Sequence, residues 1–195
     1  MAKKKTTKVI QALSPENYFR QRARSLPLHS CWINIDWRSS QMANVLVARV
    51  HTNGNITACL YLMDLLCLGV KGTRHLFNMR KDEFEALVER MDNAYGVVQI
   101  DYTLAHNIIY AGIAFAEGFG FSPDKDFTLT TSFLLEEDTD DIEIIEVVCG
   151  IDGKPVYTRG PLDNDARANQ IILQLHRTAG GGNYDIIVGV DDIEE

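Results

Sequence analysis

The chain has 195 residues, of which 46% are hydrophobic and 24% are charged, and a formal net charge of −8. This length suits one compact domain with a single core. The composition is that of a soluble globular protein, which excludes a collagen-like chain, a disulfide-dense miniprotein and a wholly disordered chain. We find no run of about 18 apolar residues, so we expect no membrane span.

The net charge combines two regions of opposite sign. Residues 1–24 hold seven basic side chains and one acidic side chain, a formal charge of +6, whereas the rest of the chain holds 12 basic and 26 acidic side chains, a formal charge of −14. We therefore predict a basic N-terminal arm with a short helix, residues 1–26, and a single domain, residues 27–195. The arm is either a solvated start of the chain or a segment that binds a polyanion, nucleic acid or a protein partner. The residues of the second interpretation are Lys3, Lys4, Lys5, Lys8, Arg20, Arg22 and Arg24.

The cysteines and the N-terminus indicate the compartment. No apolar segment follows the N-terminal lysines, as a secretory signal would require, so we expect a cytoplasmic protein. The four cysteines lie far apart in apolar surroundings and form no C-x-x-C pair: Cys31, Cys59, Cys67 and Cys149. This pattern predicts reduced, buried thiols and no metal site.

The first predicted elements are a helix and a strand. Ser14, a residue that caps helices, precedes Pro15, so a helix is expected to begin there and to end near Ser25. Alternation over 31–37 predicts a strand with one inward face. The side chains on that face are Cys31, Ile33, Ile35 and Trp37.

A β-hairpin is the clearest local prediction. The runs Val45–His51 and Ile56–Leu62 are rich in β-branched and aromatic residues and flank Asn53-Gly54. Asn-Gly favours the two positive φ angles of a type I′ turn. We expect the hairpin to extend the preceding strand into an antiparallel meander.

Two helices with a short strand between them follow. Apolar residues at helical spacing predict a helix over Lys81–Asn93, with Asp82 and Glu85 as its capping box. Val97–Ile100 is the candidate strand. A second helix is expected over Thr103–Glu117, and its small residues predict close packing against the sheet.

The C-terminal third mixes strands and helices. Phe127–Leu135 fits a helix or a strand, and we favour the helix. Ile142–Cys149 and Pro155–Thr158 predict a second hairpin that turns at Asp152-Gly153. A helix capped by Asp163 or Asn164 is expected to reach Thr178, and a last strand is expected over 184–190. The predicted fold class is α+β, with an antiparallel sheet built on β-hairpins and three or four packed helices.

Candidate catalytic residues lie on the second helix. His106, Tyr110 and Glu117 fall on one face at about 100° per residue. Such a face relays protons or orients a substrate if other groups converge on it. The alternative interpretation is a helix flank at the solvent boundary.

Aspartates near strand ends form a second candidate set. Asp36 and Asp101 are placed as in ribonuclease-H-like nucleases, where carboxylates hold Mg²⁺ through hard oxygen ligands, and Asp64 ends a further strand. The alternative interpretation is that each aspartate forms a turn or caps a helix. Mg²⁺ belongs to the first interpretation alone, and no other cofactor or metal is predicted.

Other patterns favour structural roles. The acidic run Glu136–Glu146 lacks the residue order of a calcium loop and is typical of a solvated segment. Gly180–Gly182 follows a helix, whereas phosphate loops precede one. Lys71 is a functional lysine or a surface residue. The signatures of α/β-hydrolases, zincins and dinucleotide-binding proteins are absent from the sequence.

Three stretches carry a family resemblance. They are 61–71, with the motif CLGVK; 106–127, with HNIIY and GFSPDKDF; and Gly150–Tyr157. Together they resemble an uncharacterised family of bacterial proteins, some with tetratricopeptide or SEC-C zinc motifs beside the domain. The resemblance implies no activity, and without the SEC-C cysteines it implies no zinc. Gly72 stands where the family pattern has an acidic or polar residue.

These patterns lead to two functional hypotheses. The first is a non-catalytic binding or accessory module of a bacterial cytoplasmic system. The second is a metal-dependent, nuclease-like enzyme that uses Asp36 and Asp101. The sequence leaves open whether the protein is an enzyme and what its oligomeric state is.

Overall fold

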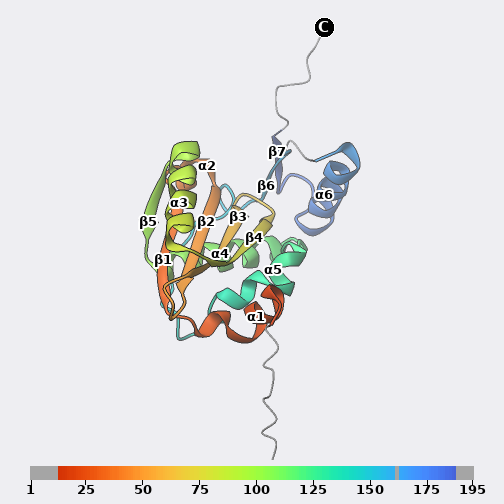
Figure 1. Cartoon of the computed structure of the whole chain (residues 1–195). Helices are drawn as coiled ribbons and strands as arrows, with labels where there is room; N and C mark the ends of the chain where they lie inside the picture. Colours follow the sequence, from red (N-terminus) through yellow and green to blue (C-terminus); the bar gives the residue numbers. More distant parts are fainter. Residues whose placement is uncertain (1–12, 161–162, 188–195) are drawn as a thin grey trace, which may run out of the picture.

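One antiparallel sheet organises the molecule. The computed structural model describes residues 13–160 and 163–187. The sheet has the strand order β4-β3-β2-β1-β5, and each neighbouring pair is antiparallel. With the helices around it (Figure 1), it confirms the predicted α+β class. The strands are β1 (Leu28–Asn34), β2 (Met42–Val50), β3 (Ile56–Asp64), β4 (Gly69–Met79) and β5 (Val97–Ile100).

The two longest helices cover opposite faces of this sheet. Successive side chains of a strand point to opposite faces. On β2, Val45 and Val47 belong to the cluster that contains α4 (Tyr102–Gly118), whereas Leu46 belongs to the cluster that contains α3 (Lys81–Tyr95). Both faces of the central strands are therefore buried, and the main core lies between the sheet and α4.

Two glycines allow α4 to approach the sheet closely. Gly69 begins β4 with a φ of +65°, and a Cβ atom built on it would lie 2.8 Å from the carbonyl oxygen of Gly112 on α4. The close packing predicted for this helix is confirmed.

The N-terminal helices pack on the main core. Helix α1 (Pro15–Arg22) begins after Ser14, whose hydroxyl accepts from the amide of Asn17, and continues into the 3₁₀ helix η1 (Ala23–Ser25). Phe19 and Ala23 are buried in the main core. The helix of the predicted arm is therefore part of the folded structure.

The ambiguous segment is helical, as favoured: α5 (Lys125–Leu129) is followed by η2 (Thr131–Leu134). Both pack on the main core, through Phe127 and Leu134.

The last elements form a smaller unit beside the sheet. Strand β6 (Val156–Thr158) pairs in parallel with β7 (Asp185–Ile187), beside α6 (Asp165–Thr178) (Figure 1). Tyr157 of β6 shares a buried cluster with Ile171 and Leu175 of α6. The core of this unit also contains Cys67 and Leu68 from the turn before β4.

Several local predictions are corrected. The strand β1 ends at Asn34, so Ile35 is 67% exposed and Trp37 begins the short helix α2 (Trp37–Ser40). The predicted capping box of α3 by Asp82 and Glu85 does not form; instead the carboxylate of Glu83 accepts from the amide of Arg80 at 2.9 Å. Of the four side chains predicted to face inward, only Ile35 does not, because the chain turns immediately after β1. Trp37 is buried in the main core from its position on α2.

The hairpin is confirmed, but its turn differs from the prediction. The amide of His51 donates to the carbonyl of Asn55, and the amide of Gly54 donates to the carbonyl of His51. Of the loop residues only Gly54 has a positive φ. This pattern is that of a three-residue loop, in which a type I turn is followed by a left-handed residue. A two-residue type I′ turn at Asn53-Gly54 would need Thr52 to pair with Asn55, whereas His51 pairs with Asn55.

The second predicted hairpin forms only at its turn, where Asp152 and Gly153 both have a positive φ and the backbones of Ile151 and Lys154 exchange two hydrogen bonds. Residues 142–149 form no strand, and only Ile151 and Lys154 form an isolated antiparallel bridge. The segment instead runs along α4, where Asn107 binds its backbone, and β6 takes β7 as its partner.

No helix within residues 13–160 and 163–187 is long and apolar enough to cross a membrane.

Candidate functional site

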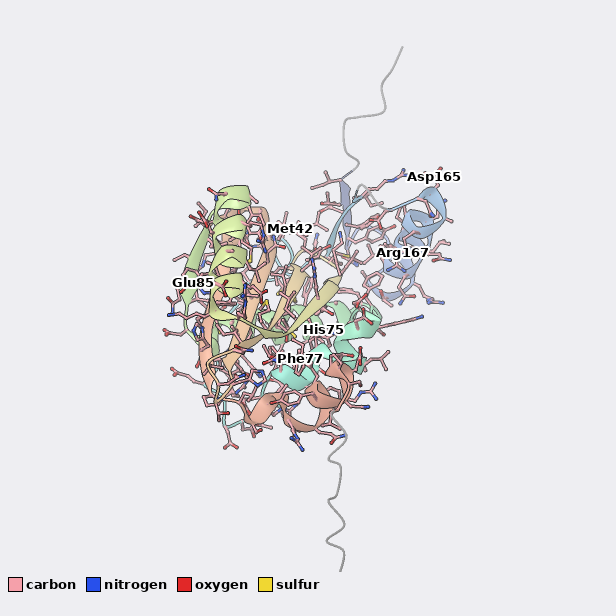
Figure 2. All side chains as sticks on the ribbon, viewed as in Figure 1. Met42, His75, Phe77, Glu85, Asp165 and Arg167 are labelled. Carbon is pink, nitrogen blue, oxygen red and sulfur yellow. The ribbon has the colours of Figure 1, made fainter. Side chains whose placement is uncertain are left out.

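A cavity of about 900 Å³ lies between the start of β4, the loop before α5 and the start of α6. We call it the Lys71 cavity. Figure 2 labels Arg167 on α6, the element on the far side of this cavity from β4. Its apolar wall is made of Leu68, Val70, Phe121 and Pro123, and its charged groups are Lys71, Lys125, Arg167, Asp124, Asp126 and Asp163.

The turn between β3 and β4 positions Lys71. Asp64 ends β3, and its Oδ1 accepts hydrogen bonds from the amides of Leu66 and Cys67, both at 3.0 Å. Its other oxygen, Oδ2, lies 3.9 Å from Lys71 Nζ. Burial raises the pKa of Asp64, against the opposing effects of Lys71 and of the backbone amides. The structure thus brings together two residues that the sequence singled out separately.

Two of the three carboxylates of the cavity, Asp124 and Asp163, accept hydrogen bonds within the fold, whereas the Asp126 carboxylate has no partner among the described residues. Asp163 Oδ2 accepts hydrogen bonds from the hydroxyl of Tyr157 and the amide of Gly160, both at 3.0 Å. Asp124 Oδ1 accepts from the amide of Asp126 at 2.9 Å. These acceptors therefore hold the walls of the cavity in place.

The cationic side chains of the cavity make fewer contacts within the protein than Asp124 and Asp163 do. The side chains of Lys125 and Arg167 form no hydrogen bond or ion pair with any described residue, and Lys71 has only the 3.9 Å contact with Asp64. Cationic donors that lack acceptors favour an acceptor-rich, anionic ligand.

The stretches that carry the family resemblance meet at this place. Residues 67–71 and 120–126 both border the Lys71 cavity. The third stretch is tied to the same turn, since the amide of Gly150 donates to the carbonyl of Leu65 and the amide of Val156 donates to the carbonyl of Leu66.

The predicted face on α4 has a different role. His106 is buried, and its Nε2 lies 3.3 Å from the carbonyl oxygen of Glu136, to which the Tyr110 hydroxyl also donates at 3.4 Å. The Tyr102 hydroxyl accepts from the Glu136 amide at 2.7 Å. Glu117 is exposed near the end of the helix and takes no part. His106 and Tyr110 therefore fix a loop, and the expected three-residue site does not form.

The register of β1 and β5 keeps Asp36 and Asp101, the two aspartates of the predicted metal site, apart. In the antiparallel β1–β5 pair, Asn34 lies opposite Val97 and Cys31 lies opposite Ile100. Asp36 follows one end of this pair and Asp101 follows the other, a separation of roughly 15–20 Å at about 3.3 Å per residue. The two carboxylates therefore do not share a metal ion, which removes the structural basis of the ribonuclease-H-like alternative. Within the described ranges, no group of three or more His, Cys, Asp or Glu side chains could hold a metal ion.

The predicted polyanion-binding residues are only partly described. Lys3, Lys4, Lys5 and Lys8 lie outside the described residues. Arg20 donates to the carbonyl of Leu129, and Arg24 pairs with Glu137. Arg20 thus joins α1 to the end of α5, and Arg24 joins η1 to the loop after η2. Polyanion binding by the arm stays a prediction. All four cysteines are free, and Cys31, Cys59 and Cys67 are buried as expected.

The buried histidine predicts a pH dependence of stability. Burial lowers the pKa of His106, although the Glu136 carbonyl and nearby carboxylates oppose this. As pH falls below about 6.5, the unfolded state therefore binds more protons than the folded state, and folding stability decreases. We expect urea unfolding of His106→Gln to show a smaller loss of stability between about pH 7 and about pH 5 than the unaltered protein. If stability depended on pH equally in the variant and in the unaltered protein, His106 would not be the source of this pH dependence. Part of the pH dependence is expected to remain in the variant, because burial also lowers the pKa of His51.

Sequence reasoning missed Lys125, Asp163 and Arg167. Lys125 lies within the motif GFSPDKDF, but the motif does not show that α5 lies beside β4, where the amide of Asp124 donates to the carbonyl of Val70. Asp163 and Arg167 come from a separate segment that only the packing of α6 brings near Lys71. Comparison with protein-family models, curated proteins and solved structures gives no match.

Proposed function

We propose that the protein is a non-catalytic binding module whose ligand is a phosphate-bearing small molecule held in the Lys71 cavity. The observation that carries the proposal is the asymmetry of its charged groups. Asp124 and Asp163 accept hydrogen bonds from the protein itself. Among the groups without a side-chain hydrogen bond or ion pair to a described residue, the cations Lys125 and Arg167 outnumber the one carboxylate, Asp126.

The chemistry of the cavity suits such a ligand. A guanidinium binds phosphate oxygens through two parallel N–H donors, and lysine ammonium groups add charge from other directions. The apolar wall formed by Leu68, Phe121 and Pro123 is available to the uncharged part of the ligand. Ligand cavities commonly combine such a wall with a few converging polar groups.

Calorimetric titration with pyrophosphate tests the proposal. We expect Lys125→Ala and Arg167→Ala each to weaken binding about tenfold, because each variant removes a charge-assisted contact. Both side chains are exposed and without described partners, so neither variant should affect folding. Arg90→Ala is the matched control, since it removes an exposed cation from α3. Absent binding, or equal losses in all three variants, would overturn the proposal.

A further inference from the structure

Residues 136–149, which we call the acidic strap, run along α4 without a strand partner among the described residues. The strap contacts Asn107 at Ile145, and Gly150 lies against the ring of Phe115. Five residues thus span the eight residues of α4 from Asn107 to Phe115, about 12 Å, whereas five helical residues would span only about 7.5 Å. The strap is therefore extended from Ile145 onward, after the turn in which the amide of Ile142 donates to the carbonyl of Thr139.

One backbone edge of the strap is bound and the other is free. The amide side chain of Asn107 donates to the carbonyl of Glu143 at 2.9 Å and accepts from the amide of Ile145 at 3.0 Å. In an extended chain, alternate residues direct their N–H and C=O groups to opposite edges. Ile144, Glu146 and Val148 therefore present theirs at the edge away from Asn107, and these groups form no hydrogen bond with a described residue.

The side chains of the strap also alternate. Val147 and Cys149 pack against the main core, whereas Ile144 is 86% exposed and Val148 is 65% exposed. A sequence rich in β-branched residues is thus held extended, with an open edge and an outer face on which Glu146 stands between Ile144 and Val148. Such an edge accepts an additional strand.

The charge of the strap identifies its partner. Glu136 pairs with Arg49 and Glu137 pairs with Arg24, but the other acidic residues have no ion pair within the described part of the chain: Asp138, Asp140, Asp141, Glu143 and Glu146. A second copy of the strap would bring like charges together, which disfavours strand pairing. We infer that the acidic strap binds a cationic, extended segment of a partner protein by β-strand addition at Ile144, Glu146 and Val148.

Amide hydrogen exchange of the full chain tests this inference. The probe is a peptide of about eight residues that alternates lysine and valine. At saturation, we expect the amides of Ile144, Glu146 and Val148 to become protected, and we expect the affinity to fall as salt is added. The control peptide has the same sequence with alternate amides N-methylated, so that it keeps the charge and loses one pairing edge.

Two substitutions of Glu146 distinguish the contribution of backbone pairing to binding from that of charge. Glu146→Pro removes the central free N–H and is expected to weaken binding about tenfold, whereas Glu146→Gln should weaken it less than about threefold. If Glu146→Pro does not fold, the N-methylated peptide makes the same comparison on the unaltered chain. Equal binding of the two peptides, or unprotected amides at saturation, would overturn the inference. If these amides became protected at high protein concentration without any peptide, the free edge would bind a second copy of the chain. That result would also overturn the inference.

Discussion

Replacing Arg49 with methionine is expected to lower the free energy of unfolding by about 2–4 kcal/mol. Its side chain is only 6% exposed, and its three nitrogens donate to the carbonyls of Leu134 and Leu26 and to the carboxylate of Glu136 at 2.6–2.8 Å. Methionine keeps most of the packing volume but leaves these three acceptors without their donor. Urea unfolding at neutral pH measures the loss.

The large effect follows from the place of Arg49 in the fold. It joins β2 to the chain after η1 and to the loop after η2, and Tyr102 lies beneath its guanidinium at 5.7 Å. Arg90→Met is the matched control and should change stability by less than about 0.5 kcal/mol, because Arg90 is exposed on α3. A loss below about 1 kcal/mol for Arg49→Met would show that the loops are held by other contacts.

Gly69→Ala is expected to cost about 3 kcal/mol of folding stability, the sum of backbone strain and overpacking. The residue has a φ of +65°, and the new methyl group would lie 2.8 Å from the carbonyl oxygen of Gly112. That oxygen belongs to the backbone of α4, so the clash is relieved only by moving the helix away from β4. Thermal or urea unfolding tests the expectation.

Gly72 provides the control on the same strand. A Cβ atom there would meet no heavy atom within 4 Å, and its φ is not in the left-handed region. We therefore expect Gly72→Ala to change stability by less than about 0.5 kcal/mol. Similar losses in the two variants would contradict the explanation from close helix packing.

Local patterns predicted the main elements well. Asn53-Gly54 located the first hairpin, and apolar spacing located α3, α4 and α6. The turn type was wrong because strand pairing, which depends on β2 and β3 together, sets the loop length. Residues 142–149 have a strand pattern, yet they lie against a helix, because the contacts with Asn107 and the main core replace a strand partner.

The candidate site was less predictable for a physical reason. Lys71 stands in a recognisable motif, but Arg167 reaches the same cavity only because Ile171 and Leu175 pack α6 against Leu68. Asp36 and Asp101 each end a strand, as the nuclease hypothesis required. The antiparallel register of β1 and β5 places them at opposite ends of that pair, and no local pattern encodes that register.

A crystal structure of the protein grown with tungstate, a heavy analogue of phosphate, tests the central claim most directly. We predict an anomalous peak in the Lys71 cavity, within hydrogen-bond distance of Lys71 and Arg167. Clear electron density for the cavity walls, with tungstate bound only elsewhere on the molecule, would contradict the proposed binding function.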